Sequence, residues 1–234
     1  MRNLSSLLLI AGLLCWEVAL QATALPASAL QPRSGERAAA TVALTFDDGP
    51  QATFTPQVLQ ILQRYRVPAT FFCIGRQVQQ DAALVRQTHQ EGDVIGDHSW
   101  SHPNLTTLSP AAIRWQLRTT SVVIQQATGV APTLFRPPYG ATNATVRNIA
   151  SQLGLTQIMW TLDTRDWQRP GVASIVNAAL GAHNGSIILM HDGGGDRSQT
   201  VQALPRIIDG LRQRGFTFIA PAEGPREAFK PLLP

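Results

Sequence analysis

The feature that most constrains the fold is an alternation between short apolar runs and longer segments whose apolar residues recur at helical spacing. The apolar runs are rich in Val, Ile and Phe, and they read TVALTF, ATFFCIG, DVIGDH, TLFRP, QIMWTLD, SIILMH and FTFIA. Segments with helical spacing lie at 55–65, 109–129, 141–154, 172–183 and 199–215. Strands that alternate with helices pair in parallel through right-handed crossovers. The sequence therefore predicts an α/β fold, either an open doubly wound sheet or a barrel.

Local signals mark the ends of several predicted helices. Ser109 is suited to cap the helix that follows it, and Pro110 is suited to the first turn. Several of the other segments end at glycine, which commonly follows a helix. Pro205 lies inside the last segment and predicts a kink or a break there.

Residues 1–29 have the order of a secretory signal peptide. Arg2 precedes the apolar run LSSLLLIAGLLCW, and the small-residue sites ATA and ASA follow it. The run is short for a membrane span. We expect cleavage after Ala29, with cleavage after Ala24 as an alternative, and export to the periplasm, the cell envelope or the medium. An uncleaved anchor is a further alternative, whereas a lipoprotein at Cys15 is disfavoured because Leu14 replaces the usual small residue.

The remainder of the chain is expected to form one domain. Residues 30–40 have no apolar period and are predicted to be a linker, and residues 222–234 are predicted to be a surface tail. Residues 41–221 contain all the predicted strands and are long enough to bury a substantial core. Once the signal peptide is removed, Cys73 is the remaining cysteine, so no intramolecular disulfide is expected.

The charge pattern indicates which partners to expect. The formal net charge is +4 and the basic residues form no run, so we expect no nucleic-acid partner. After signal cleavage we expect no stable membrane insertion, and we expect a monomer.

Residues suited to catalysis or binding follow five of the predicted strands. These clusters are DDG (47–49), HSWSH (98–102), RPPYG (136–140), DTRDW (163–167) and LMHDGGG (189–195). In parallel α/β folds the carboxyl ends of the strands meet at one edge, and that edge carries the chemistry. The sequence therefore predicts a single site built from these clusters.

Two of the clusters contain a candidate set of metal ligands. His98 and His102 are four residues apart, which would place both imidazoles on one side of a helical turn. One carboxylate from Asp47 or Asp48 would complete a set of two histidines and one carboxylate, which leaves coordination positions open. Taken alone, the histidines could be an ordinary surface or core pair, and Asp47-Asp48-Gly49 could be a turn with solvated carboxylates.

The ordered motifs TFDDG, HSWSH, RPPYG, DTRDW and LMH resemble those of the polysaccharide deacetylases that share the NodB homology domain, carbohydrate esterase family 4. The resemblance runs from about Thr41 to Ala220. It implies a single-domain α/β fold, a distorted (β/α)7 barrel of the type shared by glycoside hydrolases and deacetylases. It also implies a hydrolase of carbon–nitrogen bonds other than peptide bonds, which removes N-acetyl groups from peptidoglycan or a chitin-like polymer of N-acetylglucosamine.

The resemblance implies a divalent metal as the cofactor. Asp48, His98 and His102 would be its ligands, and zinc is expected, with cobalt or another divalent cation as an alternative. Asp97 departs from the family, in which a neutral residue is expected before the first histidine. A further carboxylate at this point is expected to affect the affinity for the metal.

The resemblance also implies the catalytic roles. Asp47 would be the general base and Arg136 its partner, while His191 would be the general acid, oriented and tuned by Asp166. A general base and a general acid are needed because an acetamide is a poor electrophile with a poor leaving group. A divalent cation would polarise its carbonyl and lower the pKa of bound water.

Three further residues are implied to bind the acetylated polysaccharide. Trp167 and Leu189 would line the pocket for the acetyl methyl group, and the backbone N–H of Tyr139 would help to hold the oxyanion.

Three other functions stay open. These are an esterase that removes O-acetyl groups from acetylated xylan or another glycan at the same site, a mononuclear iron oxygenase and a non-catalytic glycan-binding protein of the cell envelope.

Overall fold

The structure is a computed structural model that describes residues 39–220. The predicted signal peptide (1–29), most of the predicted linker (30–40) and the predicted tail (222–234) lie outside the described residues. None of the helices in the described part combines the length and apolar character that crossing a membrane requires.

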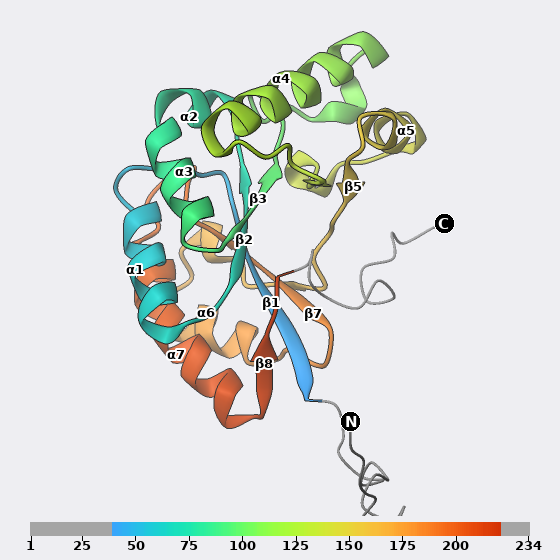
Figure 1. Cartoon of the computed structure of the whole chain (residues 1–234). Coiled ribbons are helices and arrows are strands. Elements are labelled where there is room, and N and C mark those ends of the chain that lie inside the picture. Colours follow the sequence, from blue (N-terminus) through green and yellow to red (C-terminus); the bar gives the residue numbers. More distant parts are fainter. Residues whose placement is uncertain (1–38, 221–234) are drawn as a thin grey trace, which may run out of the picture. The chain divides into compact units, whose positions relative to one another are not determined.

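The described residues form eight strands, and every pairing between them is parallel. The strands are β1 (Ala40–Asp47), β2 (Ala69–Cys73), β3 (Val94–Asp97), β4 (Leu134–Phe135), β5 (Thr156–Gln157), β6 (Leu162–Asp163), β7 (Ser186–His191) and β8 (Phe216–Phe218). Their order across the sheet is β5-β4-β3-β2-β1-β7-β6, and β8 pairs with β1. This confirms the predicted α/β class, and the parallel sheet forms a half-barrel in a single domain (Figure 1).

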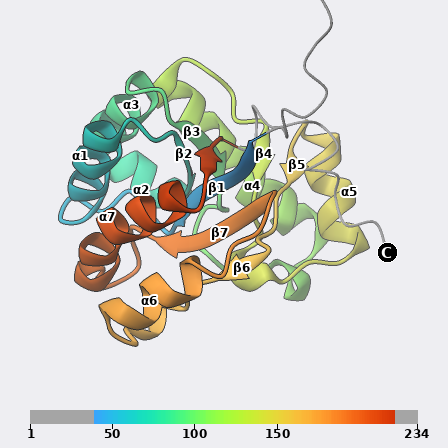
Figure 2. The ribbon, with the colours of Figure 1, turned by 90° about the horizontal axis from the view of Figure 1, so that it is seen from below.

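Seven α-helices occur in the described residues and pack around the sheet (Figures 1 and 2). They are α1 (Thr55–Tyr65), α2 (Gly75–Gln80), α3 (Ala82–Gln90), α4 (Pro110–Thr128), α5 (Ala144–Gln152), α6 (Val172–Ala179) and α7 (Ser198–Gln213). Ser109 caps α4 as predicted, because its hydroxyl accepts a hydrogen bond from the N–H of Ala112. The sequence left open whether Pro205 kinks or breaks the last helix. Helix α7 continues through Pro205, so it is not broken there.

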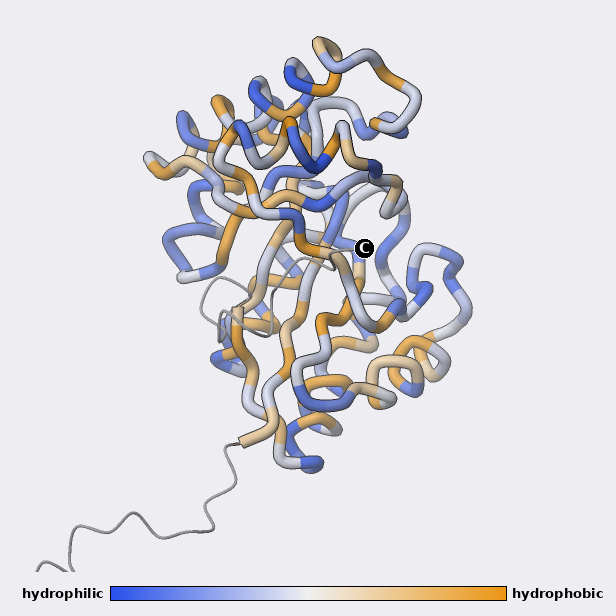
Figure 3. Tube along the Cα trace, turned by 90° about the vertical axis from the view of Figure 1, so that its right-hand side faces the viewer, coloured by the Kyte–Doolittle hydropathy of each residue, from blue (hydrophilic) through white to orange (hydrophobic). Residues whose placement is uncertain are grey.

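The alternation of side chains along β1 separates the core from the site. Val42, Leu44 and Phe46 are buried in the main apolar cluster, which includes residues of α1, α6 and α7. Ala43 belongs to a different apolar cluster. Successive strand residues point to opposite faces, so Asp47 shares the face of Ala43 rather than that of the main cluster. Figure 3 shows apolar positions along the strands that carry this core.

The segment QIMWTLD is not the single strand that its apolar character predicts. It forms β5, which pairs with β4, and β6, which pairs with β7 at the other edge of the sheet. The N–H of Ile158 still donates to Phe135, whereas the N–H of Thr161 donates to Ile187. The carbonyls of Ile158 and Met159 accept hydrogen bonds from the side chain of Arg136. These hydrogen bonds to the buried guanidinium of Arg136 take the place of continuous strand pairing through the segment.

Candidate active site

One cavity collects most of the residues that the sequence predicts for the site. It has a volume of about 400 Å³. It is lined by Asp47, Asp48, His98, His102, Tyr139, Trp160, Asp163, Trp167, Leu189 and His191. Of the predicted set, Arg136 and Asp166 are not in this lining, and both are buried.

The register of β1 and β7 brings the two proposed proton-transfer residues together. Asp47 is the partner of His191 in the parallel pairing, and Thr45 is the partner of Leu189. Side chains of paired residues on adjacent strands point to the same face. Asp47, Leu189 and His191 therefore reach the cavity from two neighbouring strands, as the clusters at the strand ends predict.

Asp48, His98 and His102 converge on one point. The Nε2 atom of His98 lies 3.4 Å from Oδ1 of Asp48, and the Nε2 atom of His102 lies 3.2 Å from the same oxygen. One ligand atom from each residue lies within 4.8 Å of the others. The three side chains thus form a set that could hold a metal ion.

The route by which the two histidines converge differs from the prediction. Residues 98–102 form a loop rather than a helical turn. Ser99 and His102 have left-handed backbone conformations, with φ of 63° and 61°, and so does Asp48, with φ of 73°. Such conformations cost about 1–3 kcal/mol in residues other than glycine and concentrate at functional sites. The expectation of a helical turn was therefore wrong.

A backbone contact fixes the tautomer of His98. Its Nδ1 atom lies 2.7 Å from the carbonyl oxygen of Arg136. Because a carbonyl can only accept, Nδ1 carries the hydrogen, and Nε2 of the neutral ring presents a lone pair to Asp48. A lone pair on Nε2 and a carboxylate oxygen at 3.4 Å repel each other unless a proton or a metal cation lies between or beside them. Oδ1 of Asp48 is buried and has no hydrogen-bond partner among the described residues.

The charges of this cluster shift its pKa values in opposite directions. Burial raises the pKa of Asp48, but the interactions with His98, His102 and His191 outweigh it and lower the pKa to about 2. Burial lowers the pKa of His98, but the nearby Asp47 and Asp48 carboxylates outweigh it, so the net shift is upward. Burial dominates at His102 and lowers its pKa. Asp48 is therefore ionised and available to a cation.

Arg136 forms a buried ion pair with Asp47. Its Nη1 atom lies 2.7 Å from Oδ1 of Asp47 and also donates to the hydroxyl of Thr45 at 2.8 Å. The guanidinium carbon lies 4.1 Å from the ring centroid of Phe72, on which it stacks. One oxygen of Asp47 is thus held by Arg136, and the other lies 3.8 Å from Nε2 of His98.

Asp166 holds His191 through two contacts. Oδ1 of Asp166 lies 2.8 Å from Nδ1 of the imidazole, and Oδ2 accepts the backbone N–H of His191 at 2.8 Å. The hydroxyl of Thr200 donates to Oδ2 at 2.7 Å. Burial lowers the pKa of His191, but the hydrogen bond and the charge of Asp166 outweigh it and raise the pKa, as a general acid requires.

The predicted substrate-binding residues form the walls of the cavity. Leu189 is buried, whereas Trp167 and Tyr139 are 49% and 70% exposed. The Tyr139 ring packs edge-on against His102 with 4.5 Å between ring centroids. Tyr139 has φ of 60°, and its N–H has no partner among the described residues. This N–H is therefore free to bind an oxygen.

The sequence did not single out several residues that complete the site. Thr45 holds Arg136 and Thr200 holds Asp166. Thr45 belongs to the TFDDG motif, but the sequence assigned no role to it, and a buried threonine in a helix such as Thr200 carries no distinguishing signal. Trp160 lines the cavity from the irregular segment that was predicted to be part of a strand. Its position next to the DTRDW motif was the available signal.

Asp97 lies under the histidine loop rather than in the cavity. It is fully buried and accepts hydrogen bonds from the N–H of Ser99 at 2.8 Å and from the hydroxyl of Ser121 at 2.9 Å. Burial raises its pKa to about 7. The contact with Ser99 supports the loop that carries His98 and His102.

A parallel half-barrel with these groups at the carboxyl ends of its strands defines the class of the protein. It is an α/β enzyme in which a candidate metal centre, a carboxylate held by arginine and a histidine held by aspartate share one cavity.

Comparison with known proteins identifies the family. The sequence model of the family described as polysaccharide deacetylase matches residues 34–158. A peptidoglycan-N-acetylglucosamine deacetylase of Bacillus cereus is 42% identical over 185 residues, which are 78% of this chain and 86% of that protein. A chitooligosaccharide deacetylase of Bradyrhizobium is 41% identical over an alignment of 189 residues, and the match covers 75% of this chain and 86% of that protein.

A solved structure agrees with this assignment. The family 4 carbohydrate esterase of Streptomyces lividans, determined in complex with acetate, has a TM-score of 0.73 and is 38% identical. The match covers 77% of this chain and 93% of that one. The chain belongs to the polysaccharide deacetylase family, as its motifs predict.

Proposed function

We propose that the protein removes N-acetyl groups from a polysaccharide of N-acetylglucosamine, such as peptidoglycan or a chitin-like polymer. The observation that carries the proposal is the meeting of three groups in one cavity of about 400 Å³. These groups are the Asp48–His98–His102 set, Asp47 held from behind by Arg136, and His191 held from behind by Asp166. The names of the relatives from Bacillus cereus and Bradyrhizobium support the same class of substrate.

The residues of the candidate metal centre fit a divalent cation. The lone pair on Nε2 of His98 faces the buried, unpartnered Oδ1 of Asp48, and His102 approaches the same oxygen. Two imidazoles and one carboxylate suit zinc, with cobalt as an alternative. When bound, such a cation supplies a Lewis acid for the acetyl carbonyl and lowers the pKa of water.

Asp47 is suited to the role of general base. The contact with Arg136 offsets the repulsion between its charge and that of Asp48, and it fixes the orientation of the carboxylate. The second oxygen of Asp47 is left to accept a proton from the attacking water. Because Nε2 of His98 lies 3.8 Å from this oxygen, the base lies beside the candidate metal ligands.

His191 is suited to the role of general acid. Asp166 holds Nδ1, which leaves Nε2 to protonate the departing nitrogen. The N–H of Tyr139 would donate to the oxygen on which negative charge develops. Leu189 and Trp167 would contact the acetyl methyl group, since both line the cavity.

An O-acetyl esterase is the second candidate function. The same base, acid and oxyanion donor would hydrolyse an ester, whose leaving group needs less assistance than an amine. The name of the Streptomyces lividans relative, a carbohydrate esterase solved with acetate, favours this alternative. The two functions differ in their expected dependence on His191.

Removal of the metal is expected to abolish acetate release. Residues 30–234 are treated with a chelator and assayed on chitooligosaccharides, peptidoglycan and acetylated xylan, before and after addition of zinc or cobalt. We expect activity on the two N-acetylated substrates to return with metal. A return of activity on acetylated xylan alone would favour the esterase, and no return on any substrate would contradict the proposed function.

We also propose that the protein acts outside the cytoplasm, because the N-terminal sequence has the order of a signal peptide. The expected mature protein begins at residue 30. Mass spectrometry of the N-terminus of the exported protein checks this expectation, and a start at residue 25 would support the alternative cleavage site. Recovery of the intact chain in the membrane fraction would instead indicate an uncleaved anchor.

A further inference from the structure

The segment between β7 and α7, residues 192–197, packs on the turn that carries the two adjacent aspartates. It reads DGGGDR, and we call residues 193–195 the glycine loop. The backbone N–H groups of Asp192 and Gly193 both donate to the carbonyl of Asp47, at 3.2 and 3.4 Å. The contact between β1 and β7 thus continues beyond the ends of both strands and reaches Asp48.

The glycine loop lies directly against Asp48. A Cβ atom on Gly193 would lie 2.1 Å from the backbone carbonyl oxygen of Asp48, and one on Gly194 would lie 2.7 Å from its Oδ2 atom. Neither position can accept a side chain unless Asp48 or the loop moves. Oδ1 of the same carboxylate lies 3.4 Å and 3.2 Å from the imidazoles of His98 and His102. One oxygen of Asp48 therefore contacts the glycine loop, and the other faces the histidines.

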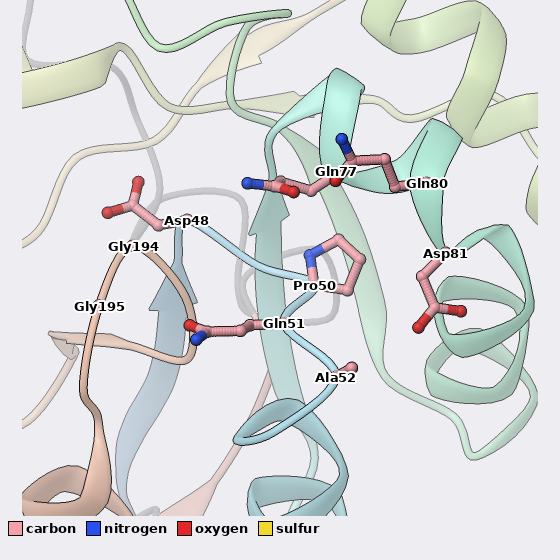
Figure 4. A pocket seen from close by; sticks show the side chains of 9 residues that line it. All are labelled: Asp48, Pro50, Gln51, Ala52, Gln77, Gln80, Asp81, Gly194 and Gly195. Atoms are coloured by element: carbon pink, nitrogen blue, oxygen red, sulfur yellow. The ribbon is translucent and has the colours of Figure 1, made fainter.

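The composition of the glycine loop does not fix its position. Three consecutive glycines have no side chains to pack, and glycine leaves the backbone its greatest conformational freedom. Gly194 and Gly195 are exposed, and together with Asp48 they line a second cavity of about 470 Å³ (Figure 4). The side of the loop that faces this cavity has no packing to hold it. The loop therefore needs an anchor elsewhere if it is to stay on Asp48.

Arg197 supplies this anchor. The residue is 5% exposed, and its Nε atom donates to the carbonyl of Gly193 at 2.6 Å. Its own backbone carbonyl accepts the N–H of Val201 in the first turn of α7. Helix α7 is fixed in turn, because residues such as Leu204 and Ile208 are buried in the main apolar cluster. Arg197 thus ties the glycine loop to the start of a helix that belongs to the core.

An ion pair does not account for the burial of Arg197. Asp196, its neighbour in the sequence, pairs with Arg169 at 2.7 Å, and Arg197 forms no ion pair with a carboxylate of the described residues. Burying a charge without such a partner costs free energy. The hydrogen bond that Arg197 does make is directed at the glycine loop, so a role in holding this loop explains why an arginine is buried here.

We infer that Arg197 is a positioning residue for the candidate metal centre. Through the carbonyl of Gly193 it holds the glycine loop against Asp48, and this contact keeps the carboxylate turned toward the two histidines. The inference rests on the proposed function and deepens it, because it names a residue that sets the affinity for the divalent cation. Arg197 is not part of the lining of the active-site cavity, so it acts through Asp48.

The variant Arg197→Met tests this inference, because it removes the donor and keeps an apolar side chain. The Kd for zinc is measured on the metal-free protein by competition with a chromophoric chelator. We expect zinc to bind about 10–100-fold more weakly, as is usual when a residue that supports a metal ligand is lost. Arg197→Lys retains a donor for the same carbonyl and is expected to recover part of the affinity.

Arg86→Met is the matched control for this measurement. The Nε atom of Arg86 donates to the backbone carbonyl of Ala127 at 3.0 Å, so the variant loses the same kind of hydrogen bond between α3 and α4. We expect its Kd for zinc to equal that of the wild type, even if its Tm falls. Equal Kd values for Arg197→Met and Arg86→Met would overturn the inference.

The variant Gly194→Ala tests the contact with Asp48 while leaving Arg197 in place. Its Cβ atom would press on Oδ2 of Asp48, so we expect weaker zinc binding. Gly215→Ala is the control, because Gly215 has φ of 80°, close to the 75° of Gly194, and a Cβ atom there would meet nothing within 4 Å. Both variants carry a similar backbone strain, so a weaker Kd in Gly194→Ala alone would support the inference. Zinc binding equal to that of Gly215→Ala would contradict it.

Zinc affinity and acetate release together separate this inference from the proposed function. Weaker zinc binding by Arg197→Met than by the wild type, with no acetate released by the metal-loaded wild type from chitooligosaccharides, peptidoglycan or acetylated xylan, would support the role of Arg197 and contradict the proposed function. Acetate release by the metal-loaded wild type, together with equal Kd values for zinc in both proteins, would support the function and overturn the role of Arg197.

Discussion

The variant Asp47→Asn is expected to release acetate about 10²–10⁴-fold more slowly than the wild type. An amide cannot accept a proton from the attacking water, although it has nearly the same shape as the carboxylate. The contact between Nη1 of Arg136 and Oδ1 of Asp47, at 2.7 Å, can persist through the side-chain carbonyl of asparagine. The loss is therefore expected in kcat, with little change in KM.

The metal content of this variant distinguishes the two adjacent aspartates. Asp47→Asn is expected to retain bound zinc, whereas Asp48→Asn is expected to lose it, because Asp48 is the carboxylate that both imidazoles approach. Atomic emission measurements on the two purified variants check this difference. Retention of zinc by Asp48→Asn together with its loss from Asp47→Asn would show that the two roles are reversed.

A loss of stability has to be separated from the loss of the base. Asp47→Asn leaves the charge of the buried Arg136 without its carboxylate partner, and breaking a buried pair costs about 3 kcal/mol or more. At about 2–4 °C per kcal/mol for a chain of this size, Tm would fall by roughly 6–12 °C. Arg136 keeps the hydroxyl of Thr45 and the carbonyl of Ile158 as acceptors, so the variant is expected to fold. Activity is therefore measured well below the lowered Tm.

The sequence was sufficient to predict that these clusters meet at one edge of the sheet, because strand direction is a global constraint. Once the strands are parallel, their carboxyl ends share an edge, and clusters that follow separate strands must meet there. Periodicity also predicted α1 accurately, since TPQVLQILQRY forms a helix over those same residues. Each strand and each helix is recognised from residues close together in the sequence, and the shared edge follows once the strands are parallel.

The parts that the sequence could not predict depend on contacts between distant segments. The loop of residues 98–102 takes its conformation from the hydrogen bond between His98 and the carbonyl of Arg136, and from the contact between Asp97 and Ser121. QIMWTLD has the composition of a strand but is divided, because two of its carbonyls bind Arg136. Local propensity contains no information about a guanidinium from another strand end.

His191→Ala is expected to lower amide hydrolysis about 10²–10⁴-fold without changing the metal content. His191 is not in the Asp48–His98–His102 set, so its loss leaves those ligands in place. Hydrolysis of 4-nitrophenyl acetate is expected to fall much less, because 4-nitrophenolate leaves without being protonated. Near-normal hydrolysis of the amide by this variant would exclude His191 as the acid.

Asp166→Asn tests the same role through pH. The hydrogen bond and the charge of Asp166 raise the pKa of His191 above the ordinary value of 6.5. A general acid works in its protonated form, so a raised pKa keeps the wild type active to higher pH, and activity declines as pH rises through that pKa. Asparagine removes the charge, the pKa of His191 falls, and the alkaline limb of kcat/KM moves to lower pH.

Thr200→Val is the matched control, since it removes one hydrogen bond to Asp166 but leaves the charge, and its limb is expected to move less. If the limb of Asp166→Asn coincides with that of the wild type, the titrating acid is another group, and the pairing of Asp166 with His191 serves only to orient the ring.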